Sequence, residues 1–225
     1  YPVISPDGSK VAFHGYSAAS MNSQVWVLDW QSNQARLVST DANGVVANSN
    51  ADYKLSFSAD NRYLVFSSVA SNLVPGDNNG AEDVFRKDLS TGEIQLVSSN
   101  GAWEIGNKES SEGRISADGR FVVFHSAASN LLGARAGEDH LYVKDMDTGT
   151  VRFVDQNADG TLQGVGYPYW GSPVISGDGS KVVFAHLTTA VYVRDMETGV
   201  MVNPITTSDG VALPGKVLPN SISQD

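Results

Sequence analysis

Short apolar runs alternate with polar turns along the whole chain. In "SADGRFVVF" (116–124), a polar turn precedes an apolar, β-branched and aromatic run that is too short for a helix and typical of a buried strand. Residues 25–28 alternate instead, with Val25 and Val27 on one face and Trp26 and Leu28 on the other. No convincing 3.6-residue periodicity is present in the sequence, so the pattern predicts an all-β protein.

The serine-led turn and the apolar run after it recur in a fixed order. The interval is roughly 50 residues, which is typical of architectures built from internal repeats. The phrases are "SPDGSKVAF" (5–13), "SADNRYLVF" (58–66), "SADGRFVVF" (116–124) and "SGDGSKVVF" (176–184), and "SQD" (223–225) begins a fifth copy. Two further markers keep this phase: "DWQSN", "DLSTG", "DMDTG" and "DMETG", and the turn pairs Asn43-Gly44, Asn100-Gly101, Asp159-Gly160 and Asp209-Gly210.

Each repeat predicts four antiparallel strands. Asp-Gly and Asn-Gly pairs tolerate the positive φ angles of tight hairpins, so the serine-led turn should join the first strand to the second. The alternating strand is the third, and a fourth, such as residues 94–97, follows the "D-x-x-TG" turn. A sandwich has similar strand spacing but not four copies of one phrase, so we expect a β-propeller of four-stranded antiparallel blades.

The predicted domain is a single propeller, or part of one. Its blades are expected at about residues 1–50, 51–110, 111–170 and 171–215, with 216–225 beginning another blade. Because the chain starts and ends on a first strand, it cannot complete a fifth blade alone. Three arrangements fit this pattern: the chain is a fragment of a larger ring, four blades close the ring and the last strand is surplus, or another chain completes the ring. We expect the fragment, since a bare blade edge invites strand pairing.

The phrase "SPDGSKVAF…VWVLD" with its following turn resembles the TolB-like β-propeller family, a WD-like repeat that also supplies the propellers of some prolyl peptidases and of the tricorn protease. The resemblance covers all four repeats. It implies ligand or protein binding on one face of the ring, in the periplasm or outside the cell. The stretch "SNLVPGDNNGAEDVF" (71–85) looks like the longer blades of secreted bacterial propeller proteins.

The chain is acidic, with a formal net charge of −10 and a pI near 4.7. Such a surface repels phosphate backbones and anionic lipid headgroups, so neither nucleic acid nor a membrane surface is an expected partner. There is no cysteine, which excludes disulfides and thiolate metal sites, and no stretch approaches the roughly 20 apolar residues of a membrane span.

The connections from the second strand to the third, and from the fourth to the next blade, are unequal in length and should share one face. Long, unequal loops on a rigid scaffold commonly carry function. One of them, "GDNNGAED" (76–83), contains Asp77, Asn79 and Asp83, whose oxygens could bind calcium. The alternative is an Asx-stabilised turn whose Asp83 begins a strand.

Histidines form a second candidate group. His14 and His125 follow the same phenylalanine in blades one and three, and His186 lies one residue later in blade four, so a shared metal or acid–base pair at the ring entrance is geometrically possible. A similarity to oligogalacturonate lyases, propellers with a histidine-bound metal, supports a metal-dependent, glycan-active enzyme as an alternative function. His140, beside Asp139, is interpreted as structural.

Aromatic residues form a third group between the fourth strands and the following blades: Trp103, Tyr167, Tyr169 and Trp170. Such side chains can stack on sugars or anchor a protein partner, or else fill gaps between blades. Nucleophile and phosphate-loop motifs are missing from the sequence. The leading hypothesis is therefore a non-catalytic propeller that binds a protein or carbohydrate through its variable loops, and another alternative is a propeller serving a peptidase domain.

Overall fold

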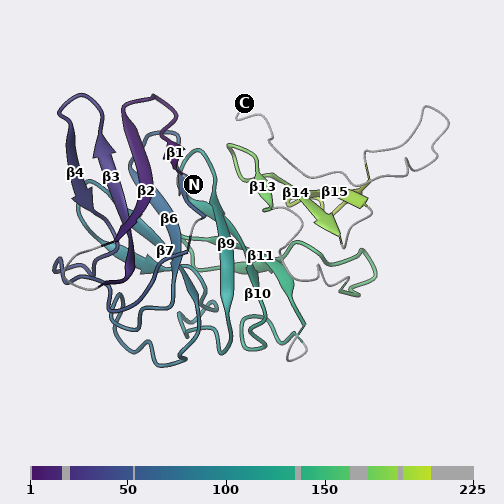
Figure 1. Ribbon diagram of the computed structural model, residues 1–225. Coiled ribbons are helices and arrows are strands. Elements are labelled where there is room, and N and C mark those ends of the chain that lie inside the picture. Colours follow the sequence, from purple (N-terminus) through teal and green to yellow (C-terminus); the bar gives the residue numbers. More distant parts are fainter. Residues whose placement is uncertain are drawn as a thin grey trace.

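A computed structural model describes residues 2–16, 21–52, 54–134, 138–162, 172–186 and 190–203. Every regular element in these ranges is a strand, and the strands form four antiparallel sheets that follow one another in chain order (Figure 1). We refer to the sheets as blades 1 to 4. Within these ranges there is no helix long and apolar enough to cross a membrane.

Each blade holds four strands that are consecutive in the sequence. Blade 1 contains β1 (Val3–Ile4), β2 (Lys10–Tyr16), β3 (Ser23–Asp29) and β4 (Gln34–Leu37). Blade 2 contains β5 (Ser56–Phe57), β6 (Tyr63–Ser68), β7 (Asp83–Asp88) and β8 (Ile94–Leu96). Blade 3 contains β9 (Ser110–Ile115), β10 (Phe121–Ser126), β11 (His140–Asp145) and β12 (Val151–Phe153). Blade 4 contains β13 (Val174–Ile175), β14 (Lys181–His186), β15 (Ala190–Asp195) and β16 (Met201–Val202).

The repeated serine closes the turn between the first and second strands. Ser5 Oγ donates to Asp7 Oδ1 at 2.8 Å and accepts the backbone N–H of Lys10 at 2.9 Å. Ser58, Ser116 and Ser176 make the same two bonds in the other blades. All four serines are buried, so each hydroxyl satisfies both of its hydrogen-bonding roles inside the protein. The repeated phrase thus encodes one turn, as the sequence predicted.

Apolar side chains on both faces of the second and third strands join neighbouring blades. Phe66 packs with Val27 of blade 1, whereas its neighbour Val65 packs with Phe124 of blade 3. A third cluster joins Val123 of blade 3 to Phe184 of blade 4. Because successive strand residues point to opposite faces, a strand buried on both sides is an unbroken apolar run. This explains why the second strand of each repeat does not alternate.

The first strands lie on the inner side of the assembly. The turns that follow them are hydrogen-bonded in series, from Ala59 N–H to Ala117 O at 2.8 Å and from Ala117 N–H to Gly177 O at 2.9 Å. The fourth strands are the opposite edges of the sheets. Each blade therefore has an inner and an outer edge, as in a propeller.

Candidate binding site on the loop face

The variable connections gather on one side, the lower side in Figure 1, and are hydrogen-bonded to each other. The backbone N–H of Asn48, between blades 1 and 2, donates to Asn72 Oδ1 at 2.9 Å, and Asn48 Oδ1 accepts the N–H of Ser71 at 3.0 Å. Asn107, Asn130 and Ser129 repeat this arrangement between blades 2 and 3. Reciprocal asparagine contacts hold these connections on the scaffold, so the loop face is an ordered surface.

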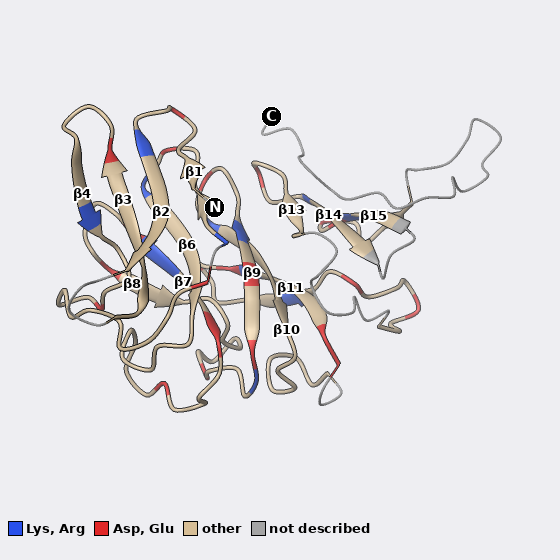
Figure 2. Ribbon diagram, in the orientation of Figure 1, with Lys and Arg blue, Asp and Glu red and all other residues tan. Residues whose placement is uncertain are grey.

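Five carboxylates, which we call the acidic cluster, interact on this face: Asp52, Glu82, Glu109, Glu112 and Asp139. Burial, together with the negative charges of Asp52, Glu112 and Glu109, raises the pKa of Glu82 to about 8. Burial and the charge of Glu109 raise the pKa of Asp139. Figure 2 shows red segments at the lower ends of β9 and β11. The cluster creates a negative potential that favours a cationic partner.

Three residues at the inner edges of blades 2, 3 and 4 meet in one polar group. Lys54, Glu112 and Ser172 each lie four residues before the repeated serine of their blade. Lys54 Nζ lies 3.3 Å from Glu112 Oε1 and donates to Ser172 Oγ at 3.3 Å, while the Ser172 hydroxyl donates to Glu112 Oε2. Glu112 is 6% exposed and has a φ of 59°, in the left-handed region. The group is not apparent from the sequence, because its three residue types differ.

Two of the predicted calcium ligands, Asp77 and Asn79, lie in the connection before β7, and the third, Asp83, is the first residue of that strand. Asn79 Nδ2 donates to Asp83 Oδ2 at 2.7 Å and to Gly106 O at 2.8 Å, and Asn79 Oδ1 accepts the N–H of Ala81 at 2.8 Å. Asp83 is buried, also accepts the Ser98 hydroxyl, and has its pKa raised by burial to about 6; burial raises the pKa of Asp77 as well. Across the described ranges, no three His, Cys, Asp or Glu side chains are grouped to hold a metal ion. Calcium binding stays a prediction.

His14 and His125 lie on different blade interfaces. His14 shares the face of β2 with Ala12, which packs toward blade 2, whereas His125 shares the face of β10 with Val123, which packs toward blade 4. Burial lowers the pKa of both histidines, that of His125 to about 4. The structure describes the backbone of His186 at the end of β14 but not its side chain. A shared metal or acid–base role for these histidines stays a prediction.

His140 is part of the core of blade 3. Its Nδ1 lies 2.7 Å from Asp155 Oδ2, and both side chains are fully buried. Burial opposes protonation of His140, but the hydrogen bond to Asp155 and its charge raise the pKa of the histidine above its ordinary value. The corresponding pairs are Ser39 with Gln24 in blade 1 and Ser98 with Asp83 in blade 2. The pair therefore ties strand three to the segment after strand four.

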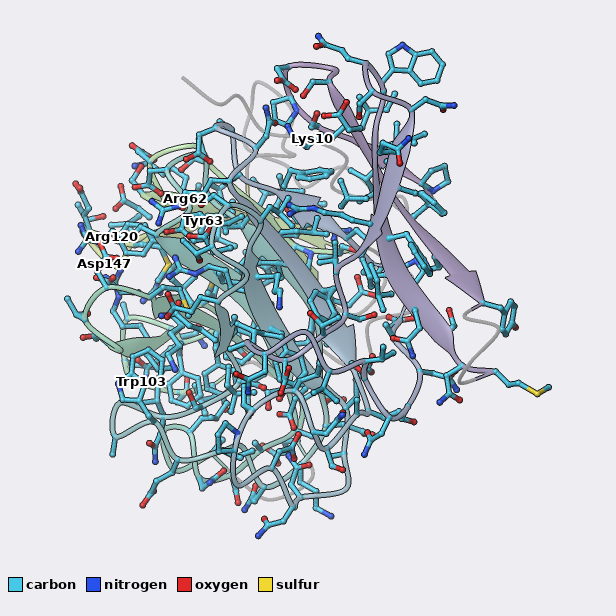
Figure 3. The ribbon with its side chains drawn as sticks, turned by 90° about the vertical axis from the view of Figure 1, so that its left-hand side faces the viewer. Lys10, Arg62, Tyr63, Trp103, Arg120 and Asp147 are labelled. Carbon is cyan, nitrogen blue, oxygen red and sulfur yellow. The ribbon has the colours of Figure 1, made fainter. Side chains whose placement is uncertain are left out.

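Trp103 lies at the outer edge between blades 2 and 3 (Figure 3). Its side chain covers Lys144 of blade 3, whose Nζ is 3.9 Å from the centroid of the indole ring. Trp103 is 46% exposed, so it both fills a gap between blades and presents an aromatic surface. Tyr167, Tyr169 and Trp170 lie outside the described residues.

The proposed equivalence of the four turn pairs is wrong for Asn100-Gly101. The isolated bridges Thr40–Val46, Ser99–Ile105 and Gln156–Leu162 enclose the same turn in three blades. In this register Trp103, with a φ of 63°, occupies the position of Gly44 and Gly160, whose φ angles are 83° and 84°. Asn100-Gly101 lies at the start of the turn, not at its left-handed position, and Asp209-Gly210 is outside the described residues.

Four-stranded antiparallel blades, joined at their inner turns and carrying their variable connections on one side, define a β-propeller. The protein has the fold of a TolB-like β-propeller. It is similar to TolB from Acinetobacter baumannii (18% identity, TM-score 0.53, covering 92% of this chain and 43% of that one). It is also similar to a putative TolB from Agrobacterium tumefaciens (18%, TM-score 0.57, covering 97% and 68%).

A peptidase propeller has the same fold. The β-propeller domain of the Trilobed protease from Pyrococcus furiosus matches at 17% identity and a TM-score of 0.55, covering 91% of this chain and 57% of that domain. No protein-family model and no curated protein matches the sequence. The chain spans less than half of the Acinetobacter TolB and somewhat more than half of the Pyrococcus propeller. At these identities the likeness establishes the fold alone.

Proposed function

We propose that this chain is a non-catalytic binding propeller that recognises a protein through its loop face, with a basic segment of the partner at the acidic cluster. The observation that carries the proposal is the position of Glu82, which is partly buried among carboxylates contributed by neighbouring blades. A Lys or Arg side chain placed there would relieve their mutual repulsion. The TolB-like fold supports a periplasmic or extracellular location.

The loop face is suited to binding because it is held rigid. The asparagine contacts between connections and the Lys54–Glu112–Ser172 group fix its inner part before a partner arrives. A preorganised surface loses less conformational entropy on association than a mobile one. The electrostatic attraction should mainly increase the association rate and should weaken as salt is added.

The test is binding to a library of Lys/Arg-rich, neutral and acidic peptides, read by fluorescence anisotropy from 50 to 500 mM salt. We expect the basic peptides to bind, with affinity falling as salt rises. The double variant Glu82→Gln/Glu109→Gln should bind at least about tenfold more weakly, since the charge of Glu109 is lost and residue 82 can no longer ionise in response to a bound cation. Glu197→Gln, at an exposed glutamate on the opposite turn of blade 4, is the control for loss of a surface carboxylate and should bind normally. Equal binding by the double variant would contradict the proposal.

A second candidate is a propeller that serves a peptidase domain, favoured by the likeness to the Trilobed protease propeller. In that role the loop face would contact a domain of the same protein. The parent gene on both sides of this chain distinguishes the two candidates, because only the second requires a peptidase domain in it. A glycan array tests carbohydrate binding, and capture of a glycan that depends on Trp103 would favour a carbohydrate partner.

A further inference from the structure

Three equivalent sites lie at the outer edges between consecutive blades. At each site, a cation from the third strand of one blade reaches back to the turn after the fourth strand of the preceding blade. Lys87 donates to Thr40 O at 2.8 Å, Lys144 to Ser99 O at 3.2 Å, and Arg194 donates to Gln156 O. The acceptor residue at each site also pairs, through an isolated β-bridge, with the residue at the other end of the turn. The three sites therefore share one framework.

The site between blades 2 and 3 is filled by Trp103. The indole covers the ammonium group of Lys144 and also lies against Gly149, where a Cβ atom would be 3.3 Å from the aromatic ring. Lys144 is fully buried beneath it. A cation under the face of an aromatic ring is an attractive arrangement, and it is stronger when water is excluded.

The site between blades 3 and 4 is filled in another way. Gly160 occupies the turn position of Trp103, so the turn supplies no side chain. The cation is Arg194, whose longer side chain fills the space itself: its Nη2 lies 3.6 Å from where a Cβ atom of Gly199 would be. Gly199 is the counterpart of Gly149, so the guanidinium lies where the indole lies one blade earlier.

The site between blades 1 and 2 is open. Gly44 occupies the turn position of Trp103, Lys87 that of Lys144, and Gly92 that of Gly149. A Cβ atom added to either glycine would meet no atom within 4 Å. A cavity of about 300 Å³ remains, lined by Gly44, Gly92, Lys87, Thr40 and Leu89 among others. Its framework matches the one that holds an indole between blades 2 and 3.

A second cavity indicates what kind of molecule fits. It has a volume of about 370 Å³ and lies on the other side of the same turn, since both cavities are lined by residues 41–43. Leu73, Val74, Pro75 and Ile94 give it an apolar wall. Two adjacent cavities, one suited to an aromatic ring and one to an aliphatic group, fit a peptide segment better than a single small ring.

We propose that the cavity between blades 1 and 2 binds a tryptophan side chain of a partner protein, with the indole over Lys87 as Trp103 lies over Lys144, and a neighbouring aliphatic side chain in the second cavity. This site does not depend on the acidic cluster. The two surfaces can bind the same partner or different ones, and either proposal can fail without the other.

The test is an NMR titration of the ¹⁵N-labelled protein with peptides that contain one Trp and one Leu at spacings of one to four residues. We expect shifts at residues 40–44, at Lys87 and at Gly92, and binding at least about tenfold tighter than that of N-acetyltryptophanamide. Peptides with Trp replaced by Leu should not shift these resonances. Unchanged resonances at residues 40–44 with every peptide overturn the proposal, and equal affinity of the amide and the peptides overturns the assignment to a protein segment.

Variants test the geometry independently. Gly44→Trp should fill the cavity from within, as Trp103 does, and abolish peptide binding. Gly160→Trp places the same residue in the equivalent turn of blade 3 and should leave binding intact. Lys87→Met removes the cation while keeping the side-chain length and should weaken binding about five- to tenfold. Thermal unfolding of each variant confirms that it is folded, and full binding by folded Gly44→Trp would contradict the proposal.

Discussion

The ammonium group of Lys144 in blade 3 lies 3.9 Å from the centroid of the Trp103 indole in blade 2. Trp103 makes this contact from a left-handed backbone conformation, which a bulky residue adopts at a cost of about 1–2 kcal/mol. The conformation persists because the turn is fixed by its neighbours: Trp103 N–H donates to Asn100 O at 2.9 Å, and Asn100 N–H to Glu104 O at 3.0 Å. The stack on Lys144 offsets this cost.

Substitution of Trp103 separates these two contributions. Trp103→Ala removes the stack and keeps the unfavourable φ, so we expect a loss of about 2–3 kcal/mol in the free energy of unfolding. Trp103→Gly also removes the stack but relieves the backbone, so it should be about 1 kcal/mol more stable than the alanine variant. Urea unfolding of the three proteins measures both differences. A glycine variant less stable than the alanine variant would show that the turn is not strained.

The same substitution should expose Lys144 to chemical modification. Burial lowers the pKa of Lys144 to about 7, so at pH 8 its amine is largely uncharged and is shielded from reagents by its burial beneath the indole. In Trp103→Ala we expect acylation of Lys144 by an amine-reactive reagent to be at least about tenfold faster, measured by peptide mass spectrometry. Lys181, which is paired with Asp195 at 3.1 Å in blade 4, is the internal control and should react equally in both proteins.

Equivalent glycines of the serine-led turns should differ in their tolerance of alanine. Gly8 and Gly179 have a φ of 73°, so alanine costs about 1 kcal/mol at either position through the backbone. A Cβ atom at Gly8 meets no atom within 4 Å, whereas at Gly179 it would lie 2.2 Å from Phe121 Cδ2. Gly179→Ala should therefore lose about 1–3 kcal/mol more than Gly8→Ala in urea unfolding. Equal losses would mean that Phe121 moves aside freely.

The blades could be predicted from the sequence because each depends on local chemistry. The bond from Ser5 to Asp7 spans two residues, so the same phrase produces the same turn wherever it occurs. Some contacts between blades, by contrast, follow no repeated residue type. One such group contains Lys54, Glu112 and Ser172, which occupy the same position in their repeats but differ in residue type. The group is therefore visible only in the structure, where the three side chains meet.

The sequence pattern assigned the left-handed position of the turn at Trp103 wrongly, to Asn100-Gly101, for a related reason. An Asn-Gly pair normally marks a left-handed position. Here the hydrogen bonds that enclose the turn place the left-handed conformation at Trp103, two residues after Gly101. The Asn43-Gly44 pair of blade 1 follows the usual rule, since Gly44 has a φ of 83°. The tryptophan at this position is explained by its contact with Lys144. Because Lys144 belongs to another blade, the sequence around Trp103 gives no sign of this contact.

Protonation of Glu82 and Asp83 should make the fold more stable at lower pH. Burial raises the pKa of Glu82 to about 8 and that of Asp83 to about 6, so the folded protein holds both protons more tightly than the unfolded chain does. Their contribution is fully present below the ordinary pKa of these groups and is lost as the pH rises through 6 for Asp83 and through 8 for Glu82. The contribution of these two groups to the free energy of unfolding should fall between pH 5 and 8, while His125, whose pKa burial lowers to about 4, acts in the opposite direction at the acidic end of this range.

Glu82→Gln tests the origin of this pH dependence, because glutamine resembles the protonated acid and does not titrate. The variant should lose the part of the slope between pH 6 and 8 and be more stable than the natural protein at pH 8, while the decrease below pH 6 from Asp83 remains. Urea unfolding at pH 5, 6, 7 and 8 measures the slope, with Glu197→Gln as the exposed control. If Glu82→Gln keeps the full slope above pH 6, the pKa of Glu82 is not raised by its surroundings. Support for an interaction among the carboxylates of the acidic cluster would then be lost.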